Sequence, residues 1–135
     1  KKVNDMFGNR AGDGVIAEMG RRIAAEAATL GAPVVARTGG DEFTLILPAE
    51  TDRSRAAAMA GTVLARLAAP VLVDGTEVQL TGSAGIACAP VDGDGPRMQA
   101  FADAALRAAK QAGGARVQGF EARLVDEARD RLDLL

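Results

Sequence analysis

The most distinctive chemistry in the chain lies where a glycine pair is followed directly by two carboxylates. This segment reads Arg37-Thr38-Gly39-Gly40-Asp41-Glu42-Phe43. Glycines let the backbone turn sharply and approach a ligand closely, and adjacent carboxylates can hold Mg²⁺ against a phosphate. The alternative interpretation is an ordinary hairpin turn that carries two solvated acids.

A second segment with ligand-binding groups lies upstream and runs into a helix. It reads Asn4-Asp5-Met6-Phe7-Gly8-Asn9-Arg10-Ala11-Gly12-Asp13. The Asn4 amide and the Asp13 carboxylate offer the mixed donors and acceptors that a purine edge requires, and a carboxylate can accept from guanine N1 and N2. Asp13 can alternatively cap the helix, and the two roles are compatible.

The composition limits the chemistry to carboxylates, Lys, Arg and the backbone. The chain has no histidine, which excludes Ser-His-Asp and Cys-His mechanisms within it. Sixteen basic and eighteen acidic residues give a net charge of −2, so no broad cationic face attracts a nucleic acid.

No run of apolar residues approaches the roughly 20 residues that are needed to cross a bilayer. The single cysteine, Cys88, cannot form an internal disulfide, and we expect a small buried hydrophobe in a cytoplasmic domain.

Hydrophobic periodicity predicts the order α-β-β-α-β-β-α-β. The first hairpin turns at Gly39-Gly40, the second helix is capped by Thr51 or Asp52, and the second hairpin turns at Asp74-Gly75. A last amphipathic helix should leave the domain. The predicted helices cover residues 13–30, 51–70, 98–112 and 121–135, and the predicted strands cover residues 33–37, 42–48, 71–73, 78–88 and 116–119.

Four segments, in their order and spacing, resemble the GGDEF family, the GTP-binding domain of bacterial diguanylate cyclases. They are residues 4–13, 39–43, 83–87 and 102–110, so the resemblance covers essentially residues 1–120. It implies an α/β (α+β) fold, a ferredoxin-like sandwich around a central, mainly antiparallel sheet. We expect a GGDEF domain in residues 1–120 that lacks its first strand, followed by an amphipathic C-terminal or connector helix in residues 121–135.

The resemblance also implies a reaction and its partners. Two domains in a homodimer, each holding GTP and Mg²⁺ (or Mn²⁺), would face one another and form cyclic di-GMP and two pyrophosphates. By position, Asn4 and Asp13 would read guanine and Ile16 would wall the base. The remaining assignments place Gly39 and Gly40 close to the nucleotide, Asp41 and Glu42 as catalytic and metal-binding residues, and Lys110 at the terminal phosphates. Lys110 can alternatively be a solvated lysine at a helix end.

The sequence departs from the family pattern at several positions. The D-x-D-x-F segment of the first strand, expected before Lys1, is absent, and Asn9 and Arg107 replace the usual His and Tyr. Gly114 stands where a phosphate-binding Arg is expected, which predicts weaker triphosphate binding unless Arg107 or Arg116 compensates. Residues 30–33 read Leu-Gly-Ala-Pro in place of the inhibitory R-x-x-D, so we expect no product inhibition there.

Two functions follow from these features. The first is an active diguanylate cyclase, because both carboxylates of the glycine segment are present. The second is a catalytically weak or inactive GTP-binding module that regulates an attached EAL phosphodiesterase domain, since residues 120–135 resemble the connector of tandem proteins. A plain C-terminal helix is the alternative for that segment. A purely structural role is disfavoured by the retained Asp41 and Glu42.

Overall fold

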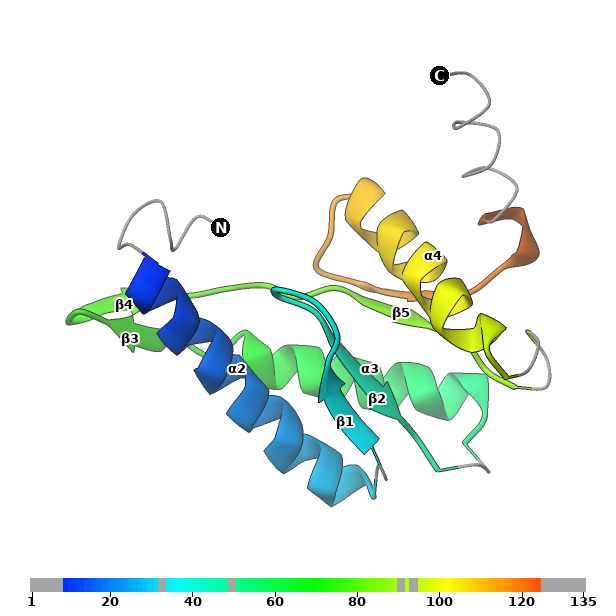
Figure 1. Cartoon of the computed structure of the whole chain (residues 1–135), viewed down its shortest axis with the longest axis horizontal. Helices are drawn as coiled ribbons and strands as arrows, with labels where there is room; N and C mark the ends of the chain where they lie inside the picture. Colours follow the sequence, from blue (N-terminus) through cyan, green and yellow to red (C-terminus); the bar gives the residue numbers. More distant parts are fainter. Residues whose placement is uncertain (1–8, 32–33, 49–50, 90–91, 93–94, 125–135) are drawn as a thin grey trace. The chain divides into compact units, whose positions relative to one another are not determined.

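The computed structural model describes residues 9–31, 34–48, 51–89, 92 and 95–124 (Figure 1). The chain forms two compact units, one made of residues 1–50 and 65–80 and the other of residues 51–64 and 81–135. Helix α3 (Arg53–Leu67) begins in the second unit, and its last turn belongs to the first. Among the described residues, no helix is long and apolar enough to cross a membrane.

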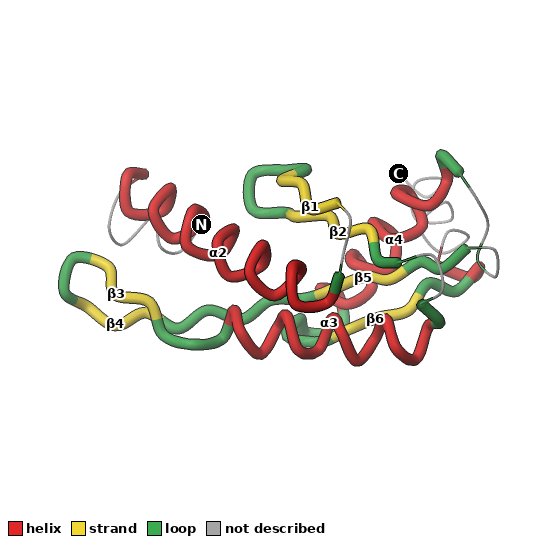
Figure 2. The backbone as a smooth tube through the Cα atoms, turned by 90° about the horizontal axis from the view of Figure 1, so that it is seen from below, coloured by secondary structure: helices red, strands yellow, loops and turns green. Residues whose placement is uncertain are grey.

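The first unit contains one long helix and two antiparallel hairpins (Figure 2). All three were predicted, although the helix begins four residues earlier than its apolar stripe indicated. The elements are α2 (Asn9–Leu30), β1 (Val34–Arg37), β2 (Phe43–Ile46), β3 (Val71–Val73) and β4 (Thr76–Val78).

The second hairpin turns through two residues with positive φ, Asp74 at 49° and Gly75 at 80°. Positive φ at both central positions is the geometry of a type I′ turn, which matches the twist of the flanking strands. An Asp-Gly pair adopts it readily, and the sequence prediction at this turn is confirmed.

The predicted long strand over residues 78–88 is wrong. β4 ends at Val78, and the chain resumes strand geometry only in β5 (Ala84–Ile86). Val78 pairs with Val71, so the next partner along the ladder would be Pro70, which has no N–H to donate. The Gln79 side chain instead donates to the Ala68 carbonyl at 3.0 Å. The alternation of apolar and polar residues continues beyond Val78, but the partner strand β3 extends no further than Val71, so the ladder ends there.

The core of the first unit joins α2 to the second hairpin. Its buried members, Val15, Met19 and Val73, are surrounded by half-buried residues Leu67, Val71, Val78 and Leu80. The Arg22 guanidinium donates to the carbonyls of Arg66, Ala69 and Pro70 at 3.2, 2.7 and 3.1 Å. These bonds satisfy the carbonyl groups that the end of α3 leaves open, which anchors that end to α2.

The second unit packs α4 (Arg97–Gln111) on a parallel pair of strands, β5 and β6 (Val117–Gly119). A Cβ atom added to Gly85 would lie 2.2 Å from the Leu106 nitrogen and 2.3 Å from the Ala102 carbonyl oxygen. Only a glycine therefore allows β5 and α4 to approach so closely.

The two ends of the second unit are also held by specific side chains. Asp52 is the cap of α3, because its Oδ1 accepts from the Arg55 N–H at 2.7 Å. Phe120 and Leu124 are buried with Ala104 and Ala105 of α4, so the first turn of the predicted C-terminal helix packs within this unit. The Phe120 and Phe101 rings stack with centroids 4.3 Å apart. Residues 125–135 lie outside the described residues.

Cys88 is half-buried, so the expectation of a buried cysteine is wrong. Its N–H donates to Asp92 Oδ2 at 2.8 Å, and the other oxygen of that carboxylate is paired with Arg53. The Asp92 carboxylate raises the pKa of Arg53 through this hydrogen bond. The segment thus bends back toward α3 instead of continuing as a strand.

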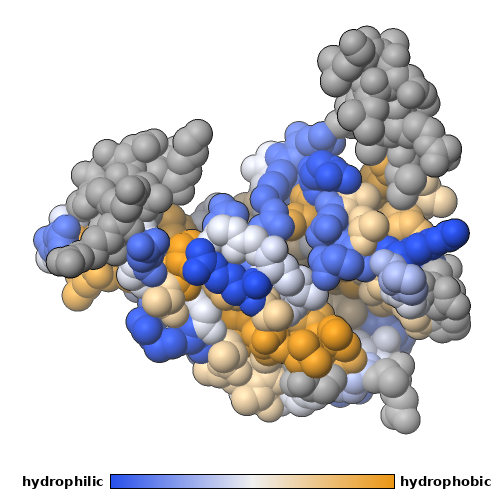
Figure 3. All heavy atoms as spheres, in the orientation of Figure 1, coloured by the Kyte–Doolittle hydropathy of each residue, from blue (hydrophilic) through white to orange (hydrophobic). Residues whose placement is uncertain are grey.

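The fold class is the predicted mixture of helices and strands, and two of the three strand pairs are antiparallel. Within the described residues the strands form three two-stranded sheets and no single central sheet. Several apolar side chains of β1 and β2 are exposed in consequence, and Figure 3 shows an apolar patch over this hairpin. They are Val34, Val35 and Ile46.

Candidate functional site

Residues 38–42 connect β1 to β2, and residues 39–42 of this connection are here called the glycine turn. The N–H groups of Thr38 and Gly39 both donate to the Glu42 carbonyl, at 2.9 and 3.3 Å. Thr38 and Thr44 share a hydrogen bond between their hydroxyls at 3.0 Å. The turn is therefore closed at its base, with Asp41 exposed and Glu42 half-buried.

The backbone conformation at position 40 does not require a glycine. Its φ is not positive, and a Cβ atom added to it would meet no described atom within 4 Å. At Gly39 an added Cβ would lie 3.3 Å from the Glu42 Cβ. Open space at an exposed glycine leaves room for another molecule to approach the backbone.

Arg37 also acts on the glycine turn, and the sequence reasoning gave it no role. Its Nε donates to the carbonyls of Gly39 and Gly40 at 3.2 and 3.1 Å, and its Nη2 donates to the Gly40 carbonyl as well. The sequence feature that could have indicated this role is the position of Arg37, two residues before a glycine pair. Glycine carbonyls are accessible to a donor because no side chains shield them.

Asp13 lies inside α2, four residues after its first residue, so its interpretation as the helix cap is wrong. Asp13, Ile16 and Gly20 are spaced three and four residues apart and share one face of the helix. A Cβ atom added to Gly20 would lie 3.4 Å from Cε1 of Phe43. Asp13 and Ile16 therefore share the helix face on which Gly20 lies close to the Phe43 ring. Asn4 lies outside the described residues.

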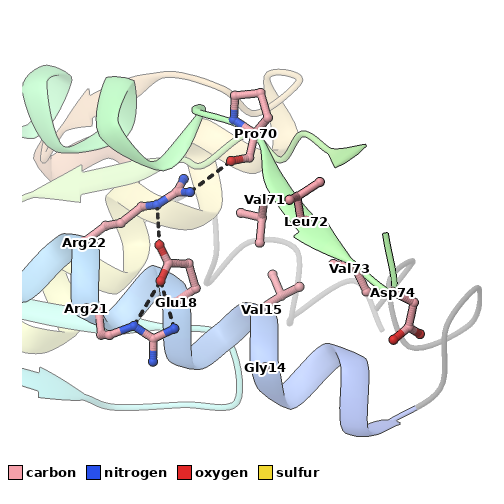
Figure 4. A pocket seen from close by; sticks show the side chains of 10 residues that line it. All are labelled: Gly14, Val15, Glu18, Arg21, Arg22, Pro70, Val71, Leu72, Val73 and Asp74. Atoms are coloured by element: carbon pink, nitrogen blue, oxygen red, sulfur yellow. Dashed lines mark hydrogen bonds and ion pairs between the residues drawn. The ribbon is translucent and has the colours of Figure 1, made fainter. Parts of the chain in front are cut away.

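A groove of about 660 Å³ runs along a different face of α2, beside β3 (Figure 4). Its helix side carries Gly14, Glu18 and Arg21, which lie about 80° to 140° around α2 from Asp13. Glu18 accepts from Arg21 and Arg22 at 3.0 Å each, and these two hydrogen bonds lower the pKa of its carboxyl. Glu18 is thus engaged by Arg21 and Arg22, and the groove does not contain the predicted site residues.

Lys110 belongs to the second unit, where it is exposed in the last turn of α4. The Gly114 N–H donates to the Ala109 carbonyl at 2.9 Å, and Gly114 has a φ of 73°. Arg116 folds back over this turn, since its Nε donates to the Gly114 carbonyl at 3.1 Å and its Nη2 lies 3.2 Å from a Cβ added to Gly113. The Arg116 guanidinium thus lies over the turn that Gly113 and Gly114 form.

The donor set at the glycine turn fits a magnesium ion that is shared with a phosphate. No group of three or more His, Cys, Asp or Glu side chains able to hold a metal occurs among the described residues. Asp41 and Glu42 offer two neighbouring carboxylates, and Mg²⁺ typically takes one or two carboxylates together with substrate phosphates and water.

Comparison with known proteins identifies the family of the chain. The sequence matches the family model described as diguanylate cyclase, GGDEF domain, over residues 1–116. It is 37% identical over 136 residues to an uncharacterized signaling protein of Caulobacter vibrioides, a match that covers 99% of this chain and 17% of that protein. It is 35% identical to the bifunctional diguanylate cyclase/cyclic di-GMP phosphodiesterase MucR of Pseudomonas aeruginosa, covering 100% of this chain and 19% of MucR.

A solved structure of PA1120 (TpbB or YfiN) from Pseudomonas aeruginosa, comprising only the GGDEF domain, superposes with a TM-score of 0.85 at 30% identity. The superposition covers 95% of this chain and 74% of that one. The chain spans less than a fifth of the length of the two curated relatives above. Because the family match includes both α2 and the glycine turn, the chain belongs to the GGDEF family of diguanylate cyclase domains.

Proposed function

We propose that this domain condenses two molecules of GTP into cyclic di-GMP with Mg²⁺, across a pair of domains. The observation that carries the proposal is the glycine turn, where an unshielded Gly40 precedes an exposed carboxylate. The same unit presents Asp13 and Ile16 on the face of α2 that contacts Phe43. Curated relatives named as diguanylate cyclases support the same reaction.

The residues of this chain would take distinct roles. Asn4 and Asp13 would bind the guanine edge, Ile16 would pack on the base, and Lys110 would bind the terminal phosphates as a point charge. Gly39 and Gly40 would admit the nucleotide to the backbone. Asp41 and Glu42 would hold the metal ion, which when bound offsets negative charge on the α-phosphate and acidifies the attacking hydroxyl.

Each half of the reaction balances in the same way. A 3′-oxygen forms a bond to the α-phosphorus of the other GTP, the bond from that phosphorus to the bridging oxygen breaks, and pyrophosphate leaves. Asp41 or Glu42 would accept the proton of the 3′-hydroxyl. Because each domain supplies one GTP, two domains must meet, so the second partner is another copy of this domain.

A regulatory GTP-binding role is the second candidate. It is favoured by Gly114, which provides no cation beside Lys110, and by a relative named as both cyclase and phosphodiesterase. In this case GTP binding would control an attached EAL domain instead of leading to product.

The two candidates separate in an assay of the full-length protein with GTP and Mg²⁺. We expect cyclic di-GMP by chromatography, and a loss of at least about a hundredfold in rate for Asp41→Asn, because the amide keeps the shape and removes the charge. Asp74→Asn is the matched control, since this exposed acid lies at the other hairpin turn. Intact GTP binding without product, even under enforced dimerisation, would exclude the cyclase and favour the regulatory role.

A further inference from the structure

We propose that Arg37 is a positioning residue that holds the glycine turn in the conformation required to direct Asp41 and Glu42. This inference rests on the proposed function, because it assigns those two carboxylates to the metal and the nucleotide. It concerns a residue outside the glycine turn, acting on the backbone inside it.

The Arg37 guanidinium donates hydrogen bonds to two successive carbonyl groups. Nε bridges the Gly39 and Gly40 oxygens at 3.2 and 3.1 Å, and Nη2 donates a second bond to Gly40. Hydrogen bonds with a charged donor are stronger than neutral ones, and a planar fork fixes direction as well as distance. Arg37 therefore restrains the orientation of both peptide groups.

The glycine turn needs such a restraint because its own residues provide little. Glycine has the greatest backbone freedom of any residue, and Gly40 is in contact with no described atom at its Cβ position. The bonds to the Glu42 carbonyl close only the base of the turn, at Thr38 and Gly39. Without Arg37, the peptide groups that follow Gly39 and Gly40 would sample several orientations.

The restraint reaches the carboxylates through the peptide plane. The Gly40 carbonyl and the Asp41 N–H belong to one planar group, so fixing the first also fixes the second and limits φ at Asp41. The direction of the Asp41 side chain follows from that backbone. A metal ion held by two neighbouring carboxylates depends on this direction, because Mg²⁺ requires near-ideal octahedral geometry.

Two substitutions of Arg37 separate the effect of its planar hydrogen-bonding group from the effect of its positive charge. Arg37→Met removes the donors, whereas Arg37→Lys keeps the charge but replaces the planar fork with a point charge that cannot bridge two carbonyls in the same way. Arg21→Met is the matched control, because Arg21 is an exposed arginine of the same unit, with its side chain 69% exposed, and it is paired with Glu18. Arg37 is itself exposed, so we expect all three variants to fold.

The test measures two properties of the full-length protein. Hydrogen–deuterium exchange of the peptide spanning residues 38–42 reports the turn, and we expect about tenfold faster exchange in both Arg37 variants. Turnover of GTP with Mg²⁺ reports the consequence, and we expect kcat to fall about tenfold while KM changes less than about threefold. Arg21→Met should match the wild-type protein in both.

The results test the role of Arg37 separately from the proposed cyclase function. Wild-type exchange in both Arg37 variants would overturn it, and so would an Arg37→Lys variant that keeps wild-type exchange and kcat, since charge alone would then suffice. If the wild-type protein neither binds GTP nor forms cyclic di-GMP, the proposed function fails. The exchange rates would still show whether Arg37 orders the turn.

Discussion

At the residue scale, Gly40 is a glycine that the proposed nucleotide would require and that the fold does not. Its φ is not positive and its Cβ position is open within the described residues, so alanine should fit the folded chain. We expect Gly40→Ala to leave the midpoint of thermal unfolding within about 2 °C of the wild type. The rate of GTP turnover should fall at least about tenfold, because the added methyl group occupies the space of the approaching nucleotide.

Differential scanning calorimetry and a turnover assay on the same preparations check this prediction. Gly61→Ala is the control, because Gly61 is an exposed glycine in α3 with no described atom near its Cβ position. It should raise stability by about 0.5–1 kcal/mol and leave turnover unchanged. A Gly40→Ala protein with normal turnover and reduced stability would mean that the turn itself requires glycine.

Arg116 is the second residue whose role depends on its position in space. Its guanidinium folds over Gly113 and Gly114, whereas Arg107 is an exposed residue of α4. We expect Arg116→Met to raise KM for GTP about threefold to tenfold, because in the proposed function this guanidinium would be a cation for the terminal phosphates. Arg107→Met should change KM much less. Steady-state kinetics of both variants measure this effect. Equal KM values for Arg116→Met and the wild type would contradict a role of Arg116 at the terminal phosphates.

At the scale of elements, the contact between β5 and α4 depends on one missing side chain. An added Cβ at Gly85 would overlap the backbone of Ala102 and Leu106, at 2.3 and 2.2 Å, and backbone atoms in a helix cannot move aside locally. We expect Gly85→Ala to lower the free energy of unfolding by about 3 kcal/mol, the upper part of the usual range for overpacking.

Urea unfolding followed by circular dichroism measures this effect, again with Gly61→Ala as the reference. The unfolding midpoint should fall clearly while the helical signal in the absence of urea stays near the wild-type value. A midpoint within error of the wild type would show that β5 and α4 separate easily, in conflict with the close approach seen here.

At the scale of the whole molecule, the proposed reaction needs two copies of the domain. One domain binds one GTP in the proposed mechanism, so a dilute protein should be limited by encounter. We expect the rate per mole of full-length protein to rise with protein concentration until dimers dominate, and fusion to a dimerising coiled coil should abolish that dependence.

A concentration series assayed by chromatography, with mass measured by light scattering over the same range, tests this expectation. A rate per mole that stays constant while the light-scattering mass is that of a monomer would contradict a reaction between two domains. The chain spans less than a fifth of the length of the two curated relatives named above.

The sequence alone determined the features that depend on neighbouring residues. The Asp74-Gly75 pair predicted its hairpin because such pairs accept positive φ. Thr51 or Asp52 predicted the start of α3, and it is the Asp52 carboxylate that accepts from the N–H of Arg55. The glycine turn and its carboxylates were found from residue types and spacing, and the family was found from the resemblance of four segments to it. These signals are local, and no distant partner was needed to interpret them.

The tertiary structure decided the features that depend on what packs against a segment. It ended β4 at Val78, because the partner strand begins after Pro70, and it explained Gly85 by the backbone of α4. It also placed Asp13 inside α2 on the face that meets Phe43, and Arg37 on the glycine carbonyls. Alternation and helical periodicity indicate which side of an element is apolar, but they carry no information about the partner on that side, and that partner sets where a strand ends and which polar groups meet.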